Sequence, residues 1–486
     1  MDIIGTLEKI VGTDRISTSQ TICQSYQFNC FMGREWEMKP DIVVMAETTE
    51  QVSEILKAAN HYKVPVTPKG VLGGSGHGGP LRGGILLDLA LMDRIISIDT
   101  KSMKSIAEAG CSFYKLSQEL FKNGLILPTP SYCTGPNVAA SAIVPANGFG
   151  KTRYGPNIDL VEGFEVVLPS GEITRIGSLA YAETDFGPYY RYITGPDLIG
   201  LFTRSNGAFG IVTKVAYRCL KRPKRWAFHS YYWRREQIEN VTKALMATTA
   251  AEIFDVHIND KWRFLWGGYS IQAKDCYFVM MFAVNAENEQ ELKGKEQTVE
   301  DISRSHGGTY LPQLAEAFYT KWPTVFYAAL PHTRRKPSTI VIPAETRFYN
   351  YLLDELIFPT PRFPEVYNKI EELCEKHGIS GLPLPPVFDG YPMKSQVISQ
   401  QTWVAIDDSD PYWVKQFYKL QGDFREWFGN KGGTFQMKVP PLVPDFCWTN
   451  QSGTLNLLKS IKSILDPNDI LSPGTFELGG SVKCKN

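Results

Sequence analysis

The chain has 486 residues, of which 43% are hydrophobic and 21% are charged, and 51 basic residues balance 51 acidic ones. This apolar content supports a large buried core and excludes wholesale disorder, and the length suggests two or three domains. The zero net charge argues against a general nucleic-acid binder, which needs a basic excess to contact phosphates. The longest apolar stretches are interrupted by charges, as at Asp88 and Asp93, so no membrane span is expected.

The first half of the chain alternates short apolar runs with stretches of helical periodicity. Thr48 and Thr49 are candidate caps of a helix that ends near His61, and a second helix is predicted within Gly110–Gly124, where Gly124 is the stop. Strands are predicted at Asp41–Met45, Val64–Thr67, Ile85–Leu89, Val161–Leu168 with a turn into Ile173, and Gly210–Leu220.

The composition changes after Pro223. Residues 224 to 440 hold most of the tryptophans and contain aromatic-rich runs such as Tyr277–Val284, which predict a second α+β domain. The last periodic segment, Asn456–Leu465, predicts a helix close to the C-terminus.

Cysteine and histidine spacing gives no metal signal. The nine cysteines include no CxxC pair, and the seven histidines show no HxH or HExxH spacing, so we expect no metal or iron–sulfur site from a local motif. Free thiols in a reducing compartment are expected instead. A cytoplasmic location is also expected, because Asp2, Glu8 and Lys9 leave no apolar signal core at the N-terminus.

The strongest local feature is the glycine loop Pro68–Pro80, PKGVLGGSGHGGP, which lies between two predicted strands. Glycines let backbone N–H groups approach a ligand closely, and consecutive amides can bind a diphosphate. The spacing matches neither the Rossmann GxGxxG motif nor a Walker A loop. Taken alone, the loop could also be a flexible connection.

Four ordered segments resemble the vanillyl-alcohol oxidase / p-cresol methylhydroxylase (PCMH) superfamily of FAD-linked oxidoreductases. Lys39–Asp99, which includes the glycine loop, resembles the opening of the FAD-binding domain. Gly148–Gly155 and the following Val161–Gly171 resemble the second flavin segment, and Gly195–Lys214 resembles the third. Leu465–Gly474, LDPNDILSPG, is similar to the C-terminal tail that returns to the flavin domain.

The resemblance implies an α+β fold in which a PCMH-type FAD-binding domain of two subdomains (1–223) is followed by an α+β cap or substrate domain (224–440) and a returning C-terminal segment (441–486). The glycine-loop backbone would hold the pyrophosphate, the Gly210–Val212 main chain the adenine side, and Ser141, Thr152 and Tyr154 the isoalloxazine. The residues expected to contact FAD are Lys69, Gly70, Val71, Leu72, Gly73, Gly74, Ser75, Gly76, His77, Pro130, Ser141, Ala142, Gly148, Thr152, Tyr154, Gly155, Gly210, Ile211 and Val212.

We expect the FAD to be bound without a covalent link. Some superfamily members attach it through a histidine of this loop, but His77 stands about four positions beyond that ligand. A hydrogen bond from His77 to backbone or diphosphate is the expected role.

The resemblance offers three models for the substrate, and this sequence departs from each. Phenol oxidases stabilise a phenolate with two tyrosines and an arginine and place an aspartate near the flavin, but these positions fall at about Ser75, Phe435–Gln436 and Ala146 here. The hydroxy-acid dehydrogenase branch carries an HxGDGN-like motif, which does not occur in this sequence. The ether-lipid synthase has a longer chain and a histidine cluster that is not found.

The candidate catalytic residues are Gln436 and Lys438, which the resemblance places near the flavin, and His257. His257 alternates with apolar residues on a predicted strand, so a core histidine is the alternative to a catalytic base. The basic cluster His332–Lys336 could bind an anion, although a solvated loop is the preferred interpretation.

We therefore predict an FAD-dependent oxidoreductase that transfers a hydride from an alcohol or hydroxy-acid carbon to flavin N5. The alternatives are oxidation of a para-substituted phenol or benzylic carbon, and an FAD-binding electron-transfer subunit of a larger complex. The partners expected are a small-molecule substrate, an electron-acceptor protein or subunit, and further copies of the chain or other subunits of a complex. The identity of the electron acceptor stays open.

Overall fold

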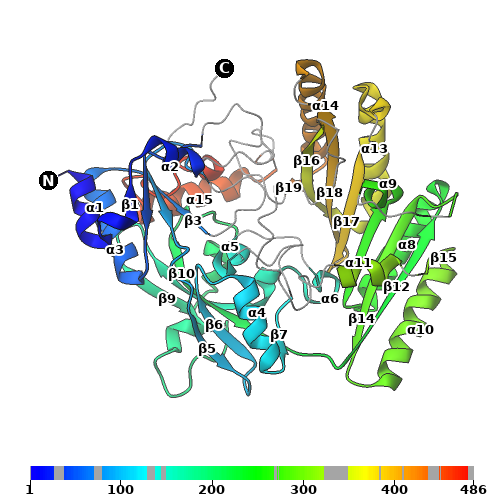
Figure 1. Cartoon of the computed structure of the whole chain (residues 1–486), viewed down its shortest axis with the longest axis horizontal. Coiled ribbons are helices and arrows are strands. Elements are labelled where there is room, and N and C mark those ends of the chain that lie inside the picture. Colours follow the sequence, from blue (N-terminus) through cyan, green and yellow to red (C-terminus); the bar gives the residue numbers. More distant parts are fainter. Residues whose placement is uncertain are drawn as a thin grey trace.

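The fold is α+β, with four β-sheets in the part of the chain that the structure describes. The computed structural model describes residues 2–26, 38–70, 79–128, 137–143, 149–266, 271, 273–312, 314–321, 348–382, 385–407, 410–435, 448 and 450–479. Figure 1 shows two lobes, one formed by the first half of the chain together with α15 (Ser452–Leu465), the other by the residues between them.

The first lobe contains two sheets that share one hydrophobic core. The four-stranded sheet has the order β1 (Ile16–Ser17), β2 (Ile42–Met45), β4 (Ile85–Asp88), β3 (Val66–Lys69), with β2 and β3 parallel to β4. The antiparallel five-stranded sheet has the order β5 (Ile95–Asp99), β6 (Lys104–Glu108), β10 (Ile211–Arg218), β8 (Val161–Val167), β9 (Ile173–Gly177). A two-stranded sheet pairs β7 (Leu125–Ile126) with β11 (Leu220–Lys221).

The helices of the first lobe cover these sheets. In chain order they are α1 (Ile3–Val11), α2 (Gln20–Ser25), α3 (Thr49–Tyr62), α4 (Phe113–Lys122), α5 (Val138–Ile143), α6 (Lys151–Tyr154) and α7 (Ile199–Phe202). The apolar face of α3 enters the core, and the Thr48 side chain accepts a hydrogen bond from the Gln51 amide at 3.1 Å, which confirms Thr48 as the N-cap.

The second lobe is built on one eight-stranded sheet, in which hydrophobic residues cover one face and part of the other. Its order is β15 (Thr309–Tyr310), β12 (Arg225–Trp233), β14 (Phe278–Ala286), β13 (Asp255–Asp260), β17 (Val387–Met393), β18 (Val397–Asp407), β16 (Phe348–Pro359), β19 (Thr434–Phe435). The other elements are α8 (Ile238–Ala250), α9 (Lys261–Trp266), α10 (Glu289–Ser305), α11 (Leu314–Lys321), α13 (Phe363–Lys376) and α14 (Pro411–Asn430).

Four helices cover one face of the eight-stranded sheet. Side chains of α8, α10, α13 and α14 form a core with alternate residues of the strands, and Figure 1 shows α10 and α13 on the side away from the first lobe. The opposite face carries a smaller aromatic core that includes Phe149 of the first lobe and Tyr319 of α11. The sheet therefore presents this second face toward the first lobe.

The C-terminal helix α15 returns to the first lobe, where its apolar residues pack on the shared core. Lys462 of α15 is 4% exposed, and its Nζ donates to the carbonyls of Ala208 at 2.9 Å and Leu471 at 2.7 Å and lies 2.5 Å from the Asp466 carboxylate. A buried ammonium with three acceptors fixes the tail beside the start of β10.

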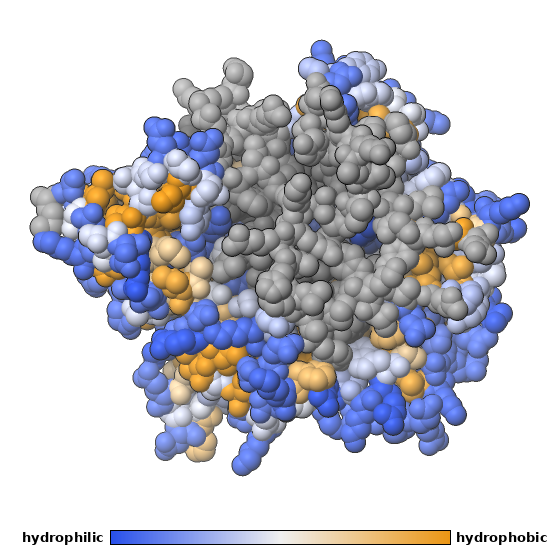
Figure 2. All heavy atoms as spheres, viewed as in Figure 1, coloured by the Kyte–Doolittle hydropathy of each residue, from blue (hydrophilic) through white to orange (hydrophobic). Residues whose placement is uncertain are grey.

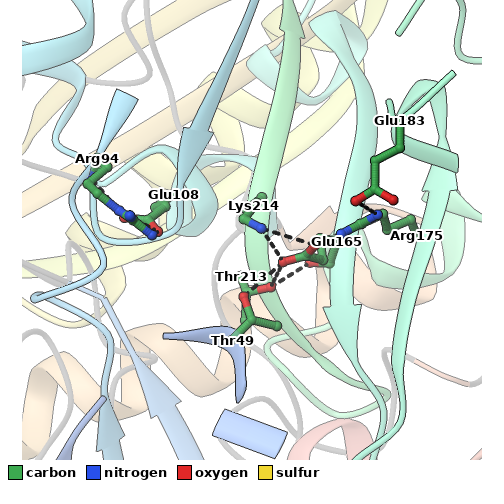
Figure 3. A network of polar contacts seen from close by, with 8 residues as sticks. All are labelled: Thr49, Arg94, Glu108, Glu165, Arg175, Glu183, Thr213 and Lys214. Atoms are coloured by element: carbon green, nitrogen blue, oxygen red, sulfur yellow. Dashed lines mark hydrogen bonds and ion pairs between the residues drawn. The ribbon is translucent and has the colours of Figure 1, made fainter. Parts of the chain in front are cut away.

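A buried carboxylate ties α3 to three strands of the five-stranded sheet. Figure 3 shows Glu165 of β8 accepting hydrogen bonds from Thr49, Thr213 and Arg175 and pairing with Lys214. These donors keep the pKa of Glu165 below its ordinary value, although burial acts in the opposite direction.

Most predicted elements are present, but their bounds differ. The predicted strand Gly210–Leu220 is split into β10 and β11, because the Cys219 amide turns to the Met103 carbonyl and the chain then pairs with β7. The predicted Gly110–Gly124 helix begins at Phe113, since Ser112 caps it, and Gly124 follows it with φ 71°, as expected. The proline-rich stretch before Met393 ends in strand β17.

The surface shown in Figure 2 is mostly hydrophilic over the described residues, with small hydrophobic patches over the part that carries α1 and α3. None of the described helices combines the length and the hydropathy that crossing a membrane would need.

Candidate functional site

The short helix α6 joins the two lobes. The Gly150 amide donates to Asp255 Oδ1 at 2.8 Å. The Thr152 hydroxyl donates to the Pro392 carbonyl at 2.9 Å and accepts from the Val256 amide at 3.0 Å. Hydrogen bonds to β13 and β17 therefore hold α6 against the second face of the eight-stranded sheet.

Lys151, the first residue of α6, is 1% exposed. Burial lowers the pKa of its ammonium to about 7, while Glu355 and Asp255 act in the opposite direction. Its Nζ lies 5.6 Å from the ring centroid of Tyr391. An amine with this pKa holds or releases a proton near neutral pH, which a surface lysine does not do.

His257 of β13 approaches the same Tyr391 ring as Lys151 and is fully buried. Its ring stacks on Phe149 at 4.9 Å between centroids and meets the Tyr391 ring edge-on at 4.5 Å. Its Nε2 is 3.0 Å from Asp255 Oδ2, the same oxygen that accepts a hydrogen bond from Tyr319 at 3.2 Å. His257 is therefore part of an aromatic core and is also paired with a buried carboxylate.

A polar row crosses the same face of the sheet. The strand register places Asn259 opposite Asp389, Asp389 opposite Gln401, and Gln401 opposite Glu355. Directly paired residues of adjacent strands point to one face, and these four side chains are at most 8% exposed. We call Asn259, Asp389, Gln401 and Glu355 the polar row.

The polar row contains both donors and acceptors. Gln401 donates to Glu355, and Asp389 accepts from the Tyr391 hydroxyl at 2.9 Å and lies 3.6 Å from Arg263 Nε. Burial raises the pKa of Asp389, against the influence of Arg263 and His257. Asn259 Nδ2 is buried and has no hydrogen-bond partner among the described residues. A buried donor without a partner is costly, so it can contribute binding energy to a ligand.

The residues beside the glycine loop fit a bound FAD. A Cβ at position 70 would overlap the Asn137 side-chain amide, so glycine is required where the loop begins. The Asn137 Oδ1 accepts from the Ala140 amide at 2.7 Å and fixes the start of α5. One turn further on, Ser141 Oγ is buried without a hydrogen-bond partner in the described part of the chain. Ser141 and the loop amides would hold FAD, and FAD would supply a hydride acceptor.

Other residues expected to contact FAD have structural partners. The Thr152 hydroxyl gives its proton to Pro392, which leaves no donor for a flavin edge. The Tyr154 ring packs edge-on against Phe254 at 6.1 Å. The Lys69 Nζ lies 4.5 Å from the Tyr26 ring centroid, and burial lowers the pKa of this ammonium.

The glycines among the expected FAD contacts are constrained by the protein itself. A Cβ at Gly210 would come within 2.5 Å of Val166 Cγ1, and one at Gly155, whose φ is 80°, would overlap the Asp159 carboxylate. Ile211 and Val212 pair with Val167 and Val166 in the sheet, and Ala142 is buried in α5 beside Ser141. Their contacts with FAD stay predictions.

Several predicted site residues lie outside the described residues. These are Val71, Leu72, Gly73, Gly74, Ser75, Gly76, His77, Pro130, Gly148, Gln436 and Lys438, together with Ala146 and the cluster His332–Lys336. Of the positions compared with phenol oxidases, Phe435 is described, and its ring packs on Phe428 at 5.3 Å.

The sequence predictions missed Lys151 and the polar row. A signal for the acidic members was present, because Asp389 and Glu355 each stand in a mainly apolar run of the sequence. Carboxylates are rarely buried without a paired or functional role. Lys151 had no comparable signal, since its burial depends on strands that lie more than a hundred residues further along the chain.

Two family models match the chain: an FAD binding domain over residues 40–177 and the C-terminal domain of FAD linked oxidases over residues 443–476. Over 186 residues the chain is 32% identical to the mitochondrial D-lactate dehydrogenase [cytochrome] of Arabidopsis thaliana, covering 38% of this chain and 31% of that protein. It is 31% identical over 189 residues to the 4-cresol dehydrogenase [hydroxylating] flavoprotein subunit of Pseudomonas putida, covering 38% and 36%.

A glycolate oxidase subunit of Bacillus subtilis is 28% identical over 228 residues, covering 46% of each chain. The chain thus spans between about a third and a half of the length of these curated relatives.

The fold is shared over the whole chain with two solved structures. p-Cresol methylhydroxylase with bound substrate has a TM-score of 0.82 at 17% identity, covering 98% of this chain and 96% of that one. The 4-ethylphenol oxidase of Gulosibacter chungangensis has a TM-score of 0.80 at 18% identity, covering 98% and 97%. The chain therefore contains an FAD binding domain and the C-terminal domain of FAD linked oxidases, and it shares its fold with p-cresol methylhydroxylase and 4-ethylphenol oxidase.

Proposed function

We propose that the chain is an FAD-dependent oxidoreductase that takes a hydride from an alcohol or hydroxy-acid carbon. The observation that carries the proposal is the buried polar site formed by Lys151, its neighbours Asp255 and His257, and the polar row. Oxidising an alcohol requires a group that accepts the hydroxyl proton and a site that excludes water. Lys151, with its lowered pKa and 1% exposure, provides the proton acceptor.

The surrounding residues have complementary tasks in this proposal. Glu355 and Asp255 stabilise the ammonium that forms when Lys151 accepts the proton. The Asn259 amide donates to a second oxygen of the substrate, since Nδ2 has no hydrogen-bond partner among the described residues. His257, which Asp255 holds in position, is the second candidate for the proton acceptor.

The described residues support an alcohol as the substrate better than they support a phenol. A phenolate needs nearby donors or a guanidinium to stabilise its charge. Arg263 already faces the Asp389 carboxylate at 3.6 Å, and the Phe435 ring is part of the helix-side core. Phenol oxidation is the second candidate, because two proteins with the same fold are named as enzymes that act on phenols.

An electron-acceptor protein is the proposed partner, supported by the relative whose name is a flavoprotein subunit. We propose 1–223, 224–440 and 441–486 as the domains and FAD as a non-covalent cofactor, which denaturation should release from the chain. A cytoplasmic location stays a prediction.

The test is anaerobic reduction of the FAD-loaded full chain by alcohols, hydroxy acids and phenols, followed by flavin absorbance. We expect bleaching by alcohols or hydroxy acids, and a rate lower by about 10²–10⁴-fold in Lys151→Met, as for loss of a general base. The exposed Lys293→Met is the matched control and should react like the unchanged protein. Bleaching by phenols alone would establish the second candidate, and a bound flavin that none of the three classes reduces would indicate an electron-transfer subunit.

A further inference from the structure

A half-open cavity of about 570 Å³ lies where the ends of two sheets meet, at the carboxyl end of α6. The first lobe contributes α6, the β5–β6 turn and the end of β10 to its lining. The second lobe contributes the end of β14, the start of α10 and Phe254. Lys151 and the polar row do not line this cavity.

Eight charged side chains line the cavity, and six of them pair with one another. Lys221 is 2.7 Å from Glu287 and Lys295 is 2.7 Å from Glu291. The third pair, which is buried, joins Lys104 and Glu162. The paired charges cancel, so the net charge of the lining depends on the two that remain.

The remaining charges are Arg153 of α6 and Arg218 at the end of β10. Neither has an ion-pair or hydrogen-bond partner among the described residues. Glu291 and Asp159 feel their charges, but Glu291 is already bonded to Lys295, and Asp159 is buried strongly enough that its pKa is raised. Two guanidinium groups without an acid at hydrogen-bond distance give the cavity a surplus positive charge.

Aromatic side chains stand beside these arginines. The Arg153 guanidinium is 5.3 Å from the Tyr154 ring centroid, and the Phe254 ring meets that ring edge-on at 6.1 Å. Pockets that combine an apolar wall with a few convergent polar groups are typical small-molecule sites, and they often lie between domains. The aromatic wall suits the apolar part of a ligand whose anionic group would contact the two arginines.

One expected FAD contact, Tyr154, lines the cavity, but the cavity lies far from the expected adenine side of the cofactor. The glycine expected to approach the adenine side of FAD, Gly210, precedes β10, whereas Arg218 ends that strand. Eight residues of extended chain separate them by about 26 Å.

We propose that this cavity binds a small organic anion, whose carboxylate or phosphate contacts Arg153 and Arg218 and whose apolar body contacts Tyr154 and Phe254. Because the ligand would touch both lobes, its binding would also stabilise their junction. The proposal stands apart from the oxidoreductase reaction proposed above, since it uses none of the residues that are proposed to accept the proton or to bind the substrate in that reaction.

The test is isothermal titration calorimetry of the FAD-loaded full chain at low salt with phenyl phosphate, inorganic phosphate and phenol. We expect saturable binding of phenyl phosphate, weaker binding of inorganic phosphate and none of phenol. Arg153→Gln and Arg218→Gln should each weaken phenyl phosphate binding by about tenfold, which corresponds to about 1.4 kcal/mol. The matched control Arg362→Gln removes an exposed guanidinium outside the cavity and should leave the affinity unchanged.

Three outcomes would overturn the proposal. They are no saturable binding of phenyl phosphate, an unchanged affinity in both cavity variants, and an equal loss in Arg362→Gln, which would indicate non-specific attraction. A fourth measurement distinguishes binding in the cavity from binding at the buried polar site that contains Lys151 and the polar row. Binding that Lys151→Met abolishes would place the anion at that site and would contradict the proposal.

Discussion

At the scale of single residues, two buried lysines show how surroundings set the state of the same side chain. Lys462 donates to two carbonyls and pairs with Asp466, so its charge is compensated where it lies. Lys151 is equally buried, and there the desolvation of the ammonium exceeds the stabilisation from Glu355 and Asp255. A structural role suits the first lysine, and proton exchange near neutral pH suits the second.

The lowered pKa of Lys151 predicts a pH-dependent stability. Between about pH 7 and the ordinary lysine pKa of 10.5, the unfolded chain binds a proton at this position that the folded chain does not. The cost of burying Lys151 therefore falls as pH rises through this window, by at most about 1.4 kcal/mol per pH unit. Urea unfolding of the protein and of Lys151→Met from pH 7 to 9 should show the unchanged protein gaining stability relative to the variant. Parallel stability curves would contradict the assigned pKa.

At the scale of elements, α15 docks on the first lobe through one buried polar group and a partly buried apolar stripe. The stripe packs on the core that the two sheets share, while the Lys462 ammonium donates to the carbonyls of Ala208 and Leu471. Parts of the molecule more than two hundred residues apart in the sequence are thereby joined beside the start of β10.

Removing this ammonium should leave Asp466 buried without its cation. We expect Lys462→Met to lose about 3–5 kcal/mol of unfolding free energy, the usual cost of breaking a buried ion pair on one side. The variant should also retain less FAD after gel filtration, because the tail supports the first lobe. Lys459→Met, on the exposed face of the same helix, is the matched control. Equal stability of the two variants would show that Lys462 does not anchor the tail.

At the scale of the whole molecule, the two lobes meet over hydrogen bonds from short segments and a small aromatic core. Besides the contacts of α6, the Arg204 guanidinium donates to the Phe435 carbonyl, and the Phe149 ring enters the core of the second lobe. The Thr152 hydroxyl is the most connected of these groups, since it bonds to two strands of the eight-stranded sheet.

Replacing the Thr152 hydroxyl should weaken the contact between the lobes and leave the hydrophobic core of each lobe intact. For Thr152→Val we expect a loss of about 1–3 kcal/mol, because the Val256 amide and the Pro392 carbonyl lose a buried partner. Hydrogen exchange should then speed up at β13 and β17 and stay unchanged at β8. Thr298→Val, which removes an exposed hydroxyl from α10, serves as the control. If hydrogen exchange at β13 and β17 were as slow in the variant as in the unchanged protein, the hydroxyl would not couple the lobes.

The sequence by itself determined the FAD-binding domain, the cofactor class and most elements of the first lobe. Glycine loops, caps and apolar strands are local signals, because the residues that form a turn or a helix are neighbours in the chain. The helix after Thr48 and the strand that carries His257 could be predicted for this reason.

The tertiary structure alone decided which side chains share the candidate site. Lys151 stands at the start of α6, yet its pKa is set by burial against β13 and β17 and by the charge of Glu355, some two hundred residues further along the chain. The polar row likewise depends on the pairing of four strands whose order differs from the chain order. Burial and electrostatics depend on distance in space, and that distance is fixed only when the two lobes have packed.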